Sequence, residues 1–568
     1  MSNYFILIFF LLFITISILG YGFLLSNSLN KNLLKYNLGY IGLLGLLTLV
    51  SISYFTIFFI KHDFLHNFII HFLGVIFFIY FFHKNKKKKD FFLLIALIIL
   101  FSSAIFILKN HDDFSYYHFS YSLGLSQNKI QMGLGNLHHG YKHHSSLFFL
   151  NSLIYLPFIK YYLFHSIGFI TLIFINIICL KFLLNKKERK NFSYIYIFYL
   201  FTIVYVNSKF YRIGEYGTDI AAQLIVLILM ALMFITIRKN LNKSFLQSNI
   251  HLIILIITYL VTVKAYFVLY LLFLIIISFI FYKNKDFVKL FFLNKIAIFV
   301  FVTATLFSIV NLSYTGCLIY PVKETCFSEK IPWALSQNEV EKMKIWYEGW
   351  AKAAAGPSIE GSKNIPEYIE KFNWLSGWFN NYFLYKGLEN LGSILLLSLL
   401  FIIIFYRNKQ KKYKKFDSDI FKILLVIIFL FCEWFYKHPT LRYGGYSLVA
   451  ALIFLPTSLF LSKVYIKDNF KKISVIRLII VSILVFNTRN LIRINKEIKI
   501  YNSQSFPLFY LPDNKFKSIN LNNGIMVFFP VEGSCWSKTY QFTPCTGGVI
   551  TLKAKRELGF DIFLKKLD

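Results

Sequence analysis

Charged side chains are scarce in this chain, and acidic ones are the scarcest. Only 15% of the 568 residues are charged, and 27 aspartates and glutamates stand against 61 lysines and arginines. Hydrophobic residues make up 57% of the chain, whereas soluble domains are about 45–50% apolar. The composition therefore excludes an ordinary soluble domain and indicates a membrane protein.

The apolar segments lack the strict alternation of a membrane β-barrel. They recur in runs of about 17 to 25 residues, which suits helices crossing a bilayer, whereas barrel strands cross in about 10 residues. They predict an all-α polytopic membrane protein with about 13–14 transmembrane helices in residues 1–488. Residues 489–568 are more polar, with short β-like runs, and predict a small C-terminal α/β domain outside the membrane.

Two further features are missing. The first apolar run, residues 4–24, has no basic N-terminal region and no small-residue cleavage site, so we interpret it as an uncleaved span. The chain also shows no solenoid repeat and no inverted halves. A repeat protein and a secondary transporter built from inverted halves are therefore disfavoured.

The positive charge gathers in short connections. The net charge is +34, and dense basic runs occupy residues 84–89, 185–190 and 406–415. Such runs remain in the cytoplasm by the positive-inside rule and attract anionic lipid headgroups. Nucleic-acid binding would instead need a basic face on a soluble module. We expect membrane lipids and no nucleic acid as partners.

Counting spans from these basic runs places four loops on the opposite side of the membrane. They are residues 109–160, 208–219, 313–385 and 437–443. We therefore expect a multi-pass membrane protein whose loops and C-terminal domain face the periplasm or exterior. Within the first loop, residues 145–159 are too short and too interrupted to span, which predicts a juxtamembrane helix at the interface.

Six cysteines are present, and four of them form two close pairs in polar segments. Cys179 and Cys432 fall within apolar runs and suit inert packing positions. If their segments lie outside the cytoplasm, Cys317 with Cys326 and Cys535 with Cys545 can form disulfides. A zinc site is the alternative, but neither spacing matches the usual gap between zinc-binding cysteines.

The first outer loop concentrates polar groups that the rest of the chain lacks. Residues 109–160 contain the doublet Asp112-Asp113 and six histidines. Polar groups beside a membrane span are costly unless they line a water-filled site. The doublet predicts a general base or a metal site, with a solvated loop end as the structural alternative. We interpret the loop as part of a catalytic site.

Other polar residues are predicted to reach the same side. Glu215 and Asp219 lie in the second loop, Lys264 at a junction between two helices, and Arg442 in a later turn. A carboxylate can take the proton of a nucleophile, while Arg, Lys or His can stabilise a phosphate leaving group. Together they suit glycosyl transfer, and a divalent cation, Mg²⁺ or Mn²⁺, could share the second task.

Two motifs in these loops admit two interpretations each. The histidines of HHGYKHH (138–144) could bind a metal, but their mixed spacing favours contact with phosphate, as does Lys142. In KHPTLRYGGY (437–446), the proline and glycines allow close approach of a ligand, and Lys437 and Arg442 could bind pyrophosphate. The alternative is that both cations extend to the membrane interface.

With these motifs in view, the chain resembles the GT-C superfamily of multi-pass glycosyltransferases that use polyprenyl-phosphate sugars. The resemblance lies in an acidic pair in an early outer loop, a following interfacial segment, acids in a later outer loop and a C-terminal outer domain. More narrowly, DDFSYYHF, GLGNLHHG, SSLFFLNSLIYLPFIKYYLFH and RYGGY are similar to an uncharacterised family of bacterial multi-pass membrane proteins. The doublet departs from GT-C because its acids are adjacent and three spans precede it.

The resemblance implies roles for particular residues. Asp112 or Asp113 would take the catalytic position, and would hold the metal if there is one, while Glu215 or Asp219 would support it. The remaining candidates would contact substrate or lipid phosphate: His111, Tyr117, His118, Asn136, His139, Lys142, His143, His144, Lys264, Lys437, His438, Arg442 and Tyr443.

The expected function is transfer of a sugar from a lipid-linked donor to an envelope glycan or lipid acceptor on the periplasmic side. The alternatives are an O-antigen-type polymerase or ligase, a flippase or transporter of lipid-linked sugars, and a non-enzymatic assembly protein. A transporter should carry charged or broken helices at mid-membrane, whereas these polar groups are predicted to gather at one face.

Overall fold

A computed structural model gives the fold. It describes residues 2–85, 87–106, 113–191, 193–215, 217–238, 242–281, 294–353, 364–406, 418–463, 468–502, 515–521, 524–531, 535, 543–546 and 552–565. Two predicted site residues, His111 and Asp112, lie outside this set.

Nine helices of the described residues are long and apolar enough to cross a membrane. They are α1 (Ser2–Leu29), α2 (Leu38–Thr56), α3 (Phe64–Asn85), α7 (Ser166–Leu183), α11 (Lys243–Val263), α14 (Lys295–Thr315), α18 (Leu388–Phe405) with the turns before it, α20 (Gly445–Ser462) and α21 (Asp468–Ile500). This is the architecture of a multi-pass membrane protein.

Five further apolar helices complete the bundle. They are α4 (Lys88–Phe101), α9 (Tyr194–Lys209), α10 (Ile220–Thr236), α12 (Leu272–Phe281) and α19 (Ser418–Lys437). The sequence-based count of about 13–14 spans includes helices of this kind. However, α4 has 14 residues, α9 has 16 and α12 has 10, and a straight span needs about 17–25.

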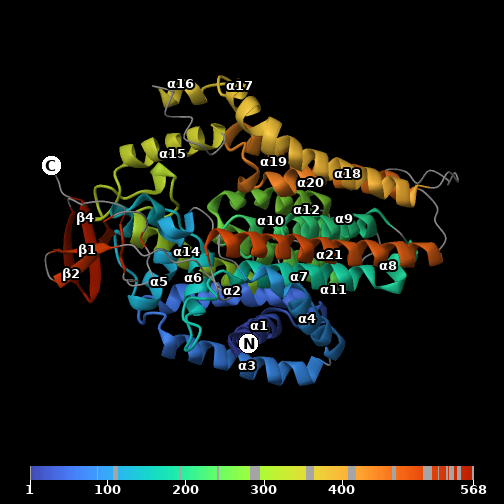
Figure 1. The fold of residues 1–568 in the computed structure, drawn as a ribbon, viewed down its shortest axis with the longest axis horizontal. Helices are drawn as coiled ribbons and strands as arrows, with labels where there is room; N and C mark the ends of the chain where they lie inside the picture. Colours follow the sequence, from blue (N-terminus) through green and yellow to red (C-terminus); the bar gives the residue numbers. More distant parts are fainter. Residues whose placement is uncertain are drawn as a thin grey trace.

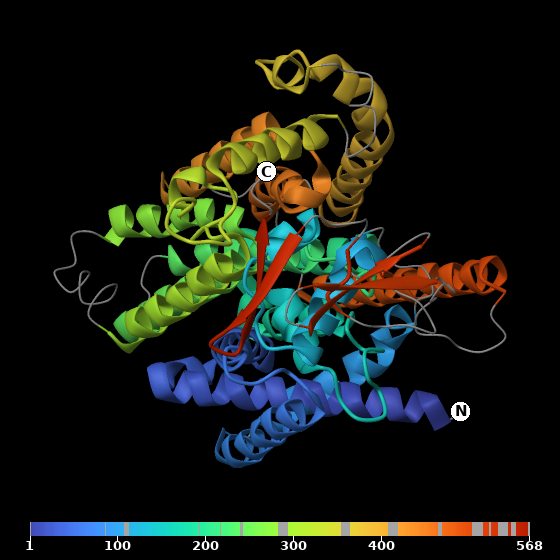
Figure 2. The same cartoon turned by 90° about the vertical axis from the view of Figure 1, so that its left-hand side faces the viewer.

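Most of the helices lie side by side along the long axis of the molecule (Figure 1), whereas α1 is seen nearly end-on there and runs across them in Figure 2. Helix α9 occupies the centre, packed against α7, α10, α20 and α21. Its residues from Ile195 to Asn207 are buried without interruption, because the helix is apolar all round. Helices α3, α18 and α21 instead expose large apolar side chains such as Phe72, Leu396 and Leu484. Such faces suit contact with lipid.

The polar elements gather at one end of the bundle. They include η3 (Phe114–His118), α5 (Phe119–Gln127), η5 (His139–Lys142), α6 (Ser146–Leu153) and α15 (Gln337–Lys352), and Figure 1 shows α5, α6 and α15 on its left-hand side. Helix α6 corrects the interfacial prediction for residues 145–159. All eight of its residues are buried, and it packs against α2 and α5. Protein, and not a membrane surface, covers its apolar side chains.

Two β-hairpins lie at the same end, where they face the viewer in Figure 2. Strand β1 (Phe516–Leu521) pairs with β2 (Ile525–Pro530), and β3 (Leu552–Glu557) pairs with β4 (Phe560–Lys565), both antiparallel. Strand β4 is hydrogen-bonded to the first polar loop, because Phe563 N donates to Met132 O (2.9 Å) and Met132 N donates to Asp561 O (2.9 Å). The last helix, α21, runs to Ile500 and so passes the predicted domain boundary at 488/489.

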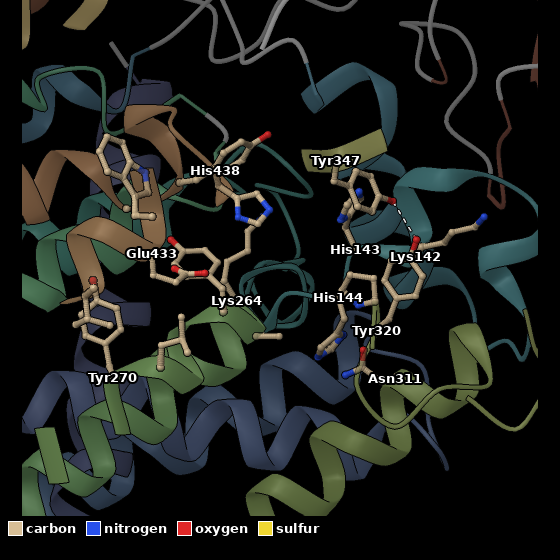
Figure 3. Close-up of a pocket in the computed structure, with 18 of the residues that line it drawn as sticks. Lys142, His143, His144, Lys264, Tyr270, Asn311, Tyr320, Tyr347, Glu433 and His438 are labelled. Carbon is tan, nitrogen blue, oxygen red and sulfur yellow. Dashed lines mark hydrogen bonds between the residues drawn. The ribbon is translucent and has the colours of Figure 1, made fainter. Parts of the chain in front are cut away.

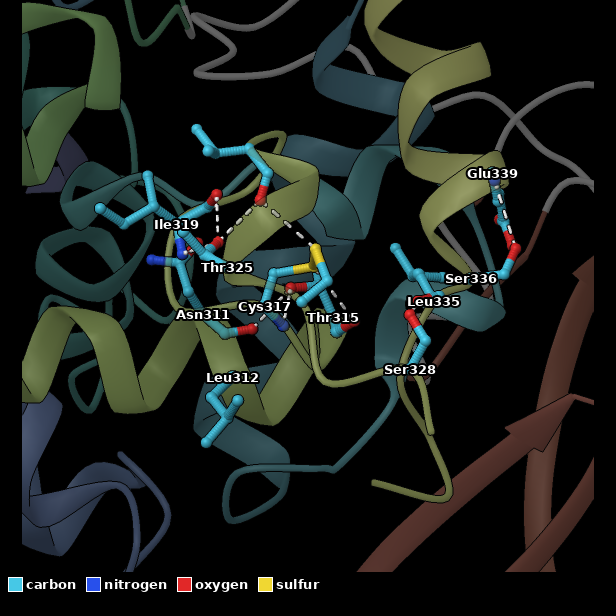
Figure 4. The surroundings of a disulfide bond; sticks show 12 residues. Asn311, Leu312, Thr315, Cys317, Ile319, Thr325, Ser328, Leu335, Ser336 and Glu339 are labelled. Atoms are coloured by element: carbon cyan, nitrogen blue, oxygen red, sulfur yellow. Dashed lines mark hydrogen bonds between the residues drawn. A yellow bond between two sulfur atoms is a disulfide. The ribbon is translucent and has the colours of Figure 1, made fainter. Parts of the chain in front are cut away.

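Both predicted cysteine pairs are bonded in the structure, Cys317 to Cys326 and Cys535 to Cys545. The first closes the loop that follows α14 (Figure 4). The second is held against the first polar loop, since Ser120 Oγ donates to the Cys535 carbonyl (3.1 Å) and Tyr141 Oη to that of Cys545 (2.9 Å). Cys179 is buried and free, and Cys432 is exposed and free.

Candidate functional site

The turn between α19 and α20 is the most tightly held segment of the polar end. Three aromatic side chains fix its backbone. Trp378 Nε1 donates to Pro439 O (2.7 Å), Trp434 Nε1 donates to Thr440 O (3.0 Å), and Leu441 N donates to Tyr382 Oη (2.8 Å). Because these bonds come from three separate elements, the turn presents Arg442 in a defined position.

A fourth side chain, Gln223 of α10, holds the other half of the turn. Its Nε2 donates to the Arg442 carbonyl (2.8 Å), and its Oε1 accepts from Ser447 N (3.3 Å). The two glycines are required here. Gly444 has φ = +116°, and a Cβ at Gly445 would lie 2.2 Å from the Trp434 ring. The sequence motif thus encodes a rigid turn.

Four charged residues meet beside this turn, and we call them the charged cluster: Asp113, Asp219, Lys264 and Arg442. Arg442 lies between the two aspartates, 3.0 Å from Asp113 Oδ2 and 3.6 Å from Asp219 Oδ2. Lys264 Nζ lies 3.1 Å from Asp219 Oδ1. The predicted convergence of these four residues is therefore found in the structure, with two positive and two negative charges.

Three members of the charged cluster stand at the end of a helix, and Arg442 lies in the turn between α19 and α20. Asp113 precedes η3, Asp219 is the N-cap residue of α10, and Lys264 caps the C-terminus of α11 before η6 (Ala265–Leu271). A carboxylate at a helix N-terminus and a cation at a helix C-terminus are both favoured by the helix dipole. The apolar helices place these charges at one level, where the bundle ends.

A cavity of about 260 Å³ adjoins the charged cluster. Figure 3 shows side chains on two facing walls of the cavity. Lys264, Tyr270, Glu433 and His438 are labelled on one wall, and Lys142, His143, His144, Asn311, Tyr320 and Tyr347 on the other. Lys142 is anchored by Glu339 of α15 at 2.6 Å. The cavity joins three predicted loops and is open to a polar ligand.

The disulfide after α14 shapes the second wall. Cys317 and Cys326 close a short loop in which Thr325 Oγ1 donates to the Ile319 carbonyl (3.1 Å) (Figure 4). The next residue, Tyr320, lines the cavity and hydrogen-bonds with the hydroxyl of Tyr347 at 3.1 Å. This loop therefore sets the position of two phenols that a ligand would meet.

The histidines of the site are neutral at physiological pH. Burial lowers the pKa of His144 to about 3 and that of His438 to about 4. Burial and the nearby Lys264 also lower the pKa of His143 well below its usual value. Positive charge for an anion must then come from Lys264, Lys142 and Arg442, and the histidines serve as neutral hydrogen-bonding groups.

Two of the predicted site residues, Glu215 and Asn136, make contacts outside the charged cluster. Glu215 pairs with Arg212, away from the charged cluster and near the ion pair of Arg493 and Glu497. Asn136 donates to the carbonyls of Trp333 (2.9 Å) and Phe563 (3.1 Å), which is a structural role. Glu215 is thus paired with a residue three positions before it and Asn136 with two backbone carbonyls, so the structure does not bring either residue into the charged cluster.

Of the remaining predicted residues, Tyr443 lines the cavity, while Tyr117, His118, His139 and Lys437 are not among the side chains that line it. Tyr117 packs on Gly140 and His143, and His118 is buried against Phe148. His139 contacts Tyr116 at 3.2 Å between Nδ1 and the hydroxyl. Lys437 pairs with Glu348 at 3.3 Å. Burial raises the pKa of the cavity-lining Tyr443 to about 12, so its hydroxyl remains a donor.

No group of three or more His, Cys, Asp and Glu side chains converges as metal ligands would, within the described part of the chain. Of the predicted metal-binding doublet, Asp113 forms an ion pair with Arg442, and Asp112 lies outside the described residues.

Sequence reasoning missed Glu433 and Gln223. Glu433 stands alone in the apolar run ILLVIIFLFCEWF and lines the cavity. An ionisable residue within a membrane helix is itself a signal for function. Gln223 gave no comparable signal, because its role depends on a turn more than 200 residues later.

A second cavity, of about 470 Å³, lies on the other side of the turn. It is lined almost entirely by apolar side chains of the segment before α18 and of α19 and α20, including Phe379, Phe435 and Val449. Trp434 lines both cavities, and Leu441, next to Arg442, lines the apolar one. An apolar space and a charged site therefore share one turn.

Residues 4–449 match a family model described as a domain of unknown function, DUF8201. The chain belongs to the DUF8201 family. All four members of the charged cluster fall within the DUF8201 match, as does Glu433, whereas the four β-strands follow it. No curated protein and no solved structure matches the chain.

Proposed function

We propose that this protein transfers a sugar from a polyprenyl-phosphate donor to a glycan or lipid of the cell envelope, at the periplasmic face of the bacterial inner membrane. The observation that carries the proposal is the joining of charge and apolar space at one turn. Arg442 and Lys264 supply cations at the polar end of the bundle, and the apolar cavity begins at Leu441.

The donor chemistry accounts for both halves of the site. A polyprenyl phosphate has one phosphate at the end of a long apolar chain. Its phosphate would lie against Arg442 and Lys264, which bind the leaving oxygen and stabilise the charge that develops there. The chain would enter the apolar cavity beside Trp434. Both cations are already held in place by Asp113 and Asp219, so little reorganisation is needed.

The sugar and the acceptor would meet in the cavity of about 260 Å³. Its walls are rich in tyrosines, among them Tyr266, Tyr320, Tyr347 and Tyr443. Phenols combine an apolar face with a polar hydroxyl. They therefore suit a sugar ring, which presents C–H groups on its faces and hydroxyls around its rim.

A binding experiment tests the donor half of the proposal. Purified protein in detergent should bind farnesyl phosphate, a short polyprenyl phosphate, and should bind farnesol or inorganic phosphate far more weakly. The R442A variant should weaken farnesyl phosphate binding about 10- to 100-fold, the usual worth of a charged hydrogen bond. The exposed strand residue Lys553 provides the control K553A. Equal binding of farnesyl phosphate by R442A would refute the assignment.

A cellular experiment tests the reaction. Mass spectrometry of envelope glycans from a deletion strain should show a missing sugar, and expression of the wild-type protein should restore it. Unchanged glycans would defeat the proposal. If the purified protein moves a labelled lipid-linked sugar across a vesicle membrane without altering it, the protein is a transporter.

A further inference from the structure

Glu433 is an acidic residue that lines the cavity but is not part of the charged cluster. It lies on α19, one helical turn before Lys437, and its side chain is half-buried. In Figure 3 it projects into the cavity on the same wall as Lys264 and His438. Its neighbours on that wall are aromatic and apolar, including Leu430, Trp434 and Tyr270.

The other acids around the cavity are each held by a cation. Asp113 and Asp219 contact Arg442, Glu339 contacts Lys142, and Glu348 contacts Lys352 and Lys437. Among the described residues, no ion pair within 4.0 Å holds the Glu433 carboxylate; Lys437, one turn further along α19, acts on it only from a greater distance and is paired with Glu348. An acid in an apolar helix is costly to bury without a partner. Its presence therefore needs a reason beyond packing.

The negative charge of Glu433 is also unfavourable for phosphate binding in the same cavity. A carboxylate that shares a cavity with Lys264 lowers the positive potential there. Stability and anion binding would both improve if this residue were neutral. Glu433 is therefore unfavourable both for folding and for donor binding, yet it faces the cavity. A role in the chemical step would account for its presence there.

A second polar group points to a ligand in the same space. The hydroxyl of Tyr266 is buried and makes no hydrogen bond to any part of the chain that the structure describes. It lies at Gly444, where a Cβ would approach it to 3.6 Å, and Tyr266 lines the cavity. A buried hydroxyl without a partner destabilises the folded protein, because it has lost its hydrogen bonds to water. A polar ligand in the cavity would restore that bond.

We infer that Glu433 is the general base, which takes the proton from the hydroxyl group of the substrate that receives the sugar. This inference rests on the proposed function. The acceptor O–H gives its proton to the Glu433 carboxylate, and its oxygen forms a bond to the anomeric carbon of the donor sugar. The bond from that carbon to the phosphate oxygen breaks, and its electron pair leaves with the lipid phosphate. Glu433 then returns the proton to water.

The positions of the two groups suit these opposite tasks. Lys264 and Arg442, both members of the charged cluster, bind the leaving phosphate, while Glu433 projects into the cavity. Asp113 and Asp219 hold these cations in position and do not exchange protons with the substrate. This inference places the base on α19, whereas the sequence-based prediction places it in the aspartate doublet.

The substitution E433Q separates the two tasks. Glutamine keeps the size of the side chain but cannot accept the proton, so sugar transfer should fall about 10²- to 10⁴-fold. Farnesyl phosphate should bind E433Q at least as tightly as it binds the wild type, because a negative charge has left the cavity. Transfer is followed by glycan mass spectrometry in the complemented deletion strain, and binding with the purified protein.

The control is E329Q, at an exposed glutamate in the loop after α14, and it should leave both measurements unchanged. Transfer by E433Q at more than half of the wild-type level would overturn the inference. Weaker farnesyl phosphate binding by E433Q, with its thermal unfolding unchanged, would do so as well and would make Glu433 a binding residue. If the wild type itself neither binds farnesyl phosphate nor restores the glycan, the proposed function fails instead.

A second variant applies if E433Q is poorly recovered from membranes. E433D keeps a carboxylate but withdraws it by one methylene. Transfer should be slower than wild type and its pH dependence should persist, with farnesyl phosphate binding unchanged. Transfer at the wild-type rate would contradict a positioned base.

Discussion

At the scale of single residues, the molecule is organised by Arg442. One guanidinium joins two aspartates that are 106 positions apart in the sequence, Asp113 and Asp219. A planar fork with several donors can serve two carboxylates at once, whereas an ammonium group is a single point of charge. Gln223 further fixes the backbone of Arg442, because its Nε2 donates to the Arg442 carbonyl.

The variant R442K tests this geometry. The charge stays, but Lys cannot contact both Asp113 and Asp219 from the same backbone position. Farnesyl phosphate binding should weaken about tenfold, corresponding to about 1.4 kcal/mol, while the protein still reaches the membrane. The matched control is R556K, at an exposed arginine of β3. Unchanged binding by R442K would show that charge alone matters at this position.

The buried histidines predict how stability depends on pH. His144 and His438 have pKa values of about 3 and about 4, below the usual 6.5, because burial disfavours their charged forms. The unfolded chain therefore binds more protons than the folded chain between pH 6.5 and about 4. The stabilisation is complete above pH 6.5 and is lost as the pH falls through that window.

Thermal unfolding of the detergent-solubilised protein between pH 7.5 and 4.5 measures this effect. The unfolding temperature should fall on acidification, and H144Q should reduce the fall, since glutamine does not titrate. An unfolding temperature that rises toward pH 4.5 would contradict the assignment of these histidines as neutral buried groups.

At the scale of elements, the turn between α19 and α20 separates the two cavities. Aromatic side chains from three segments and Gln223 hold it, so each cavity is bounded by a backbone with little freedom. The first polar loop is held in a different way, by β4 and by the disulfide of Cys535 and Cys545. Both walls of the site thus depend on contacts between distant parts of the chain.

Adding a methyl group to this turn should disturb it. In G445A the new Cβ would meet the Trp434 ring at 2.2 Å, and Trp434 also bonds Thr440. Overpacking of this kind costs about 1–3 kcal/mol. The unfolding temperature in detergent should fall, and farnesyl phosphate binding should weaken.

Gly392 of α18 is the matched control, because nothing lies within 4 Å of the position of its Cβ. G392A should keep the wild-type unfolding temperature or raise it, since alanine favours helix over glycine by about 1 kcal/mol. Equal behaviour of G445A and G392A would mean that the turn is not tightly packed.

At the scale of the whole molecule, the two ends of the bundle differ in charge and structure. One end holds the charged cluster, the cavity and the β-hairpins. The basic helix α8 (Lys186–Asn191) lies at the other, as Figure 1 shows. The helices between them expose apolar faces. We expect this axis to be perpendicular to the membrane, with the basic end in the cytoplasm.

Cysteine labelling tests the orientation. In a C432S background, which removes the exposed free thiol, K553C in β3 should react with a membrane-impermeant maleimide in cells with a permeabilised outer membrane. K187C in α8 should react only after the inner membrane is opened. Both lysines are exposed in the structure. The reverse pattern would place the site in the cytoplasm and would exclude a periplasmic reaction.

Much of the site could be predicted from sequence because its members stand at helix ends. Asp113, Asp219, Lys264 and Arg442 were assigned to one side by counting apolar runs, and they meet in the structure. The same counting assigned Glu215 to that side, yet Glu215 pairs with Arg212. Counting gives a level along the membrane normal, but lateral position depends on which helices are neighbours.

Helix length and hydropathy are local properties, so the long apolar helices with polar groups at their ends can be read from the amino-acid sequence. The burial of α6, the position of Arg442 between two aspartates and the exposure of Glu433 to a cavity depend instead on the packing of the folded chain. Those outcomes depend on contacts between residues hundreds of positions apart. Their energies are set by packing and burial, which no local pattern records.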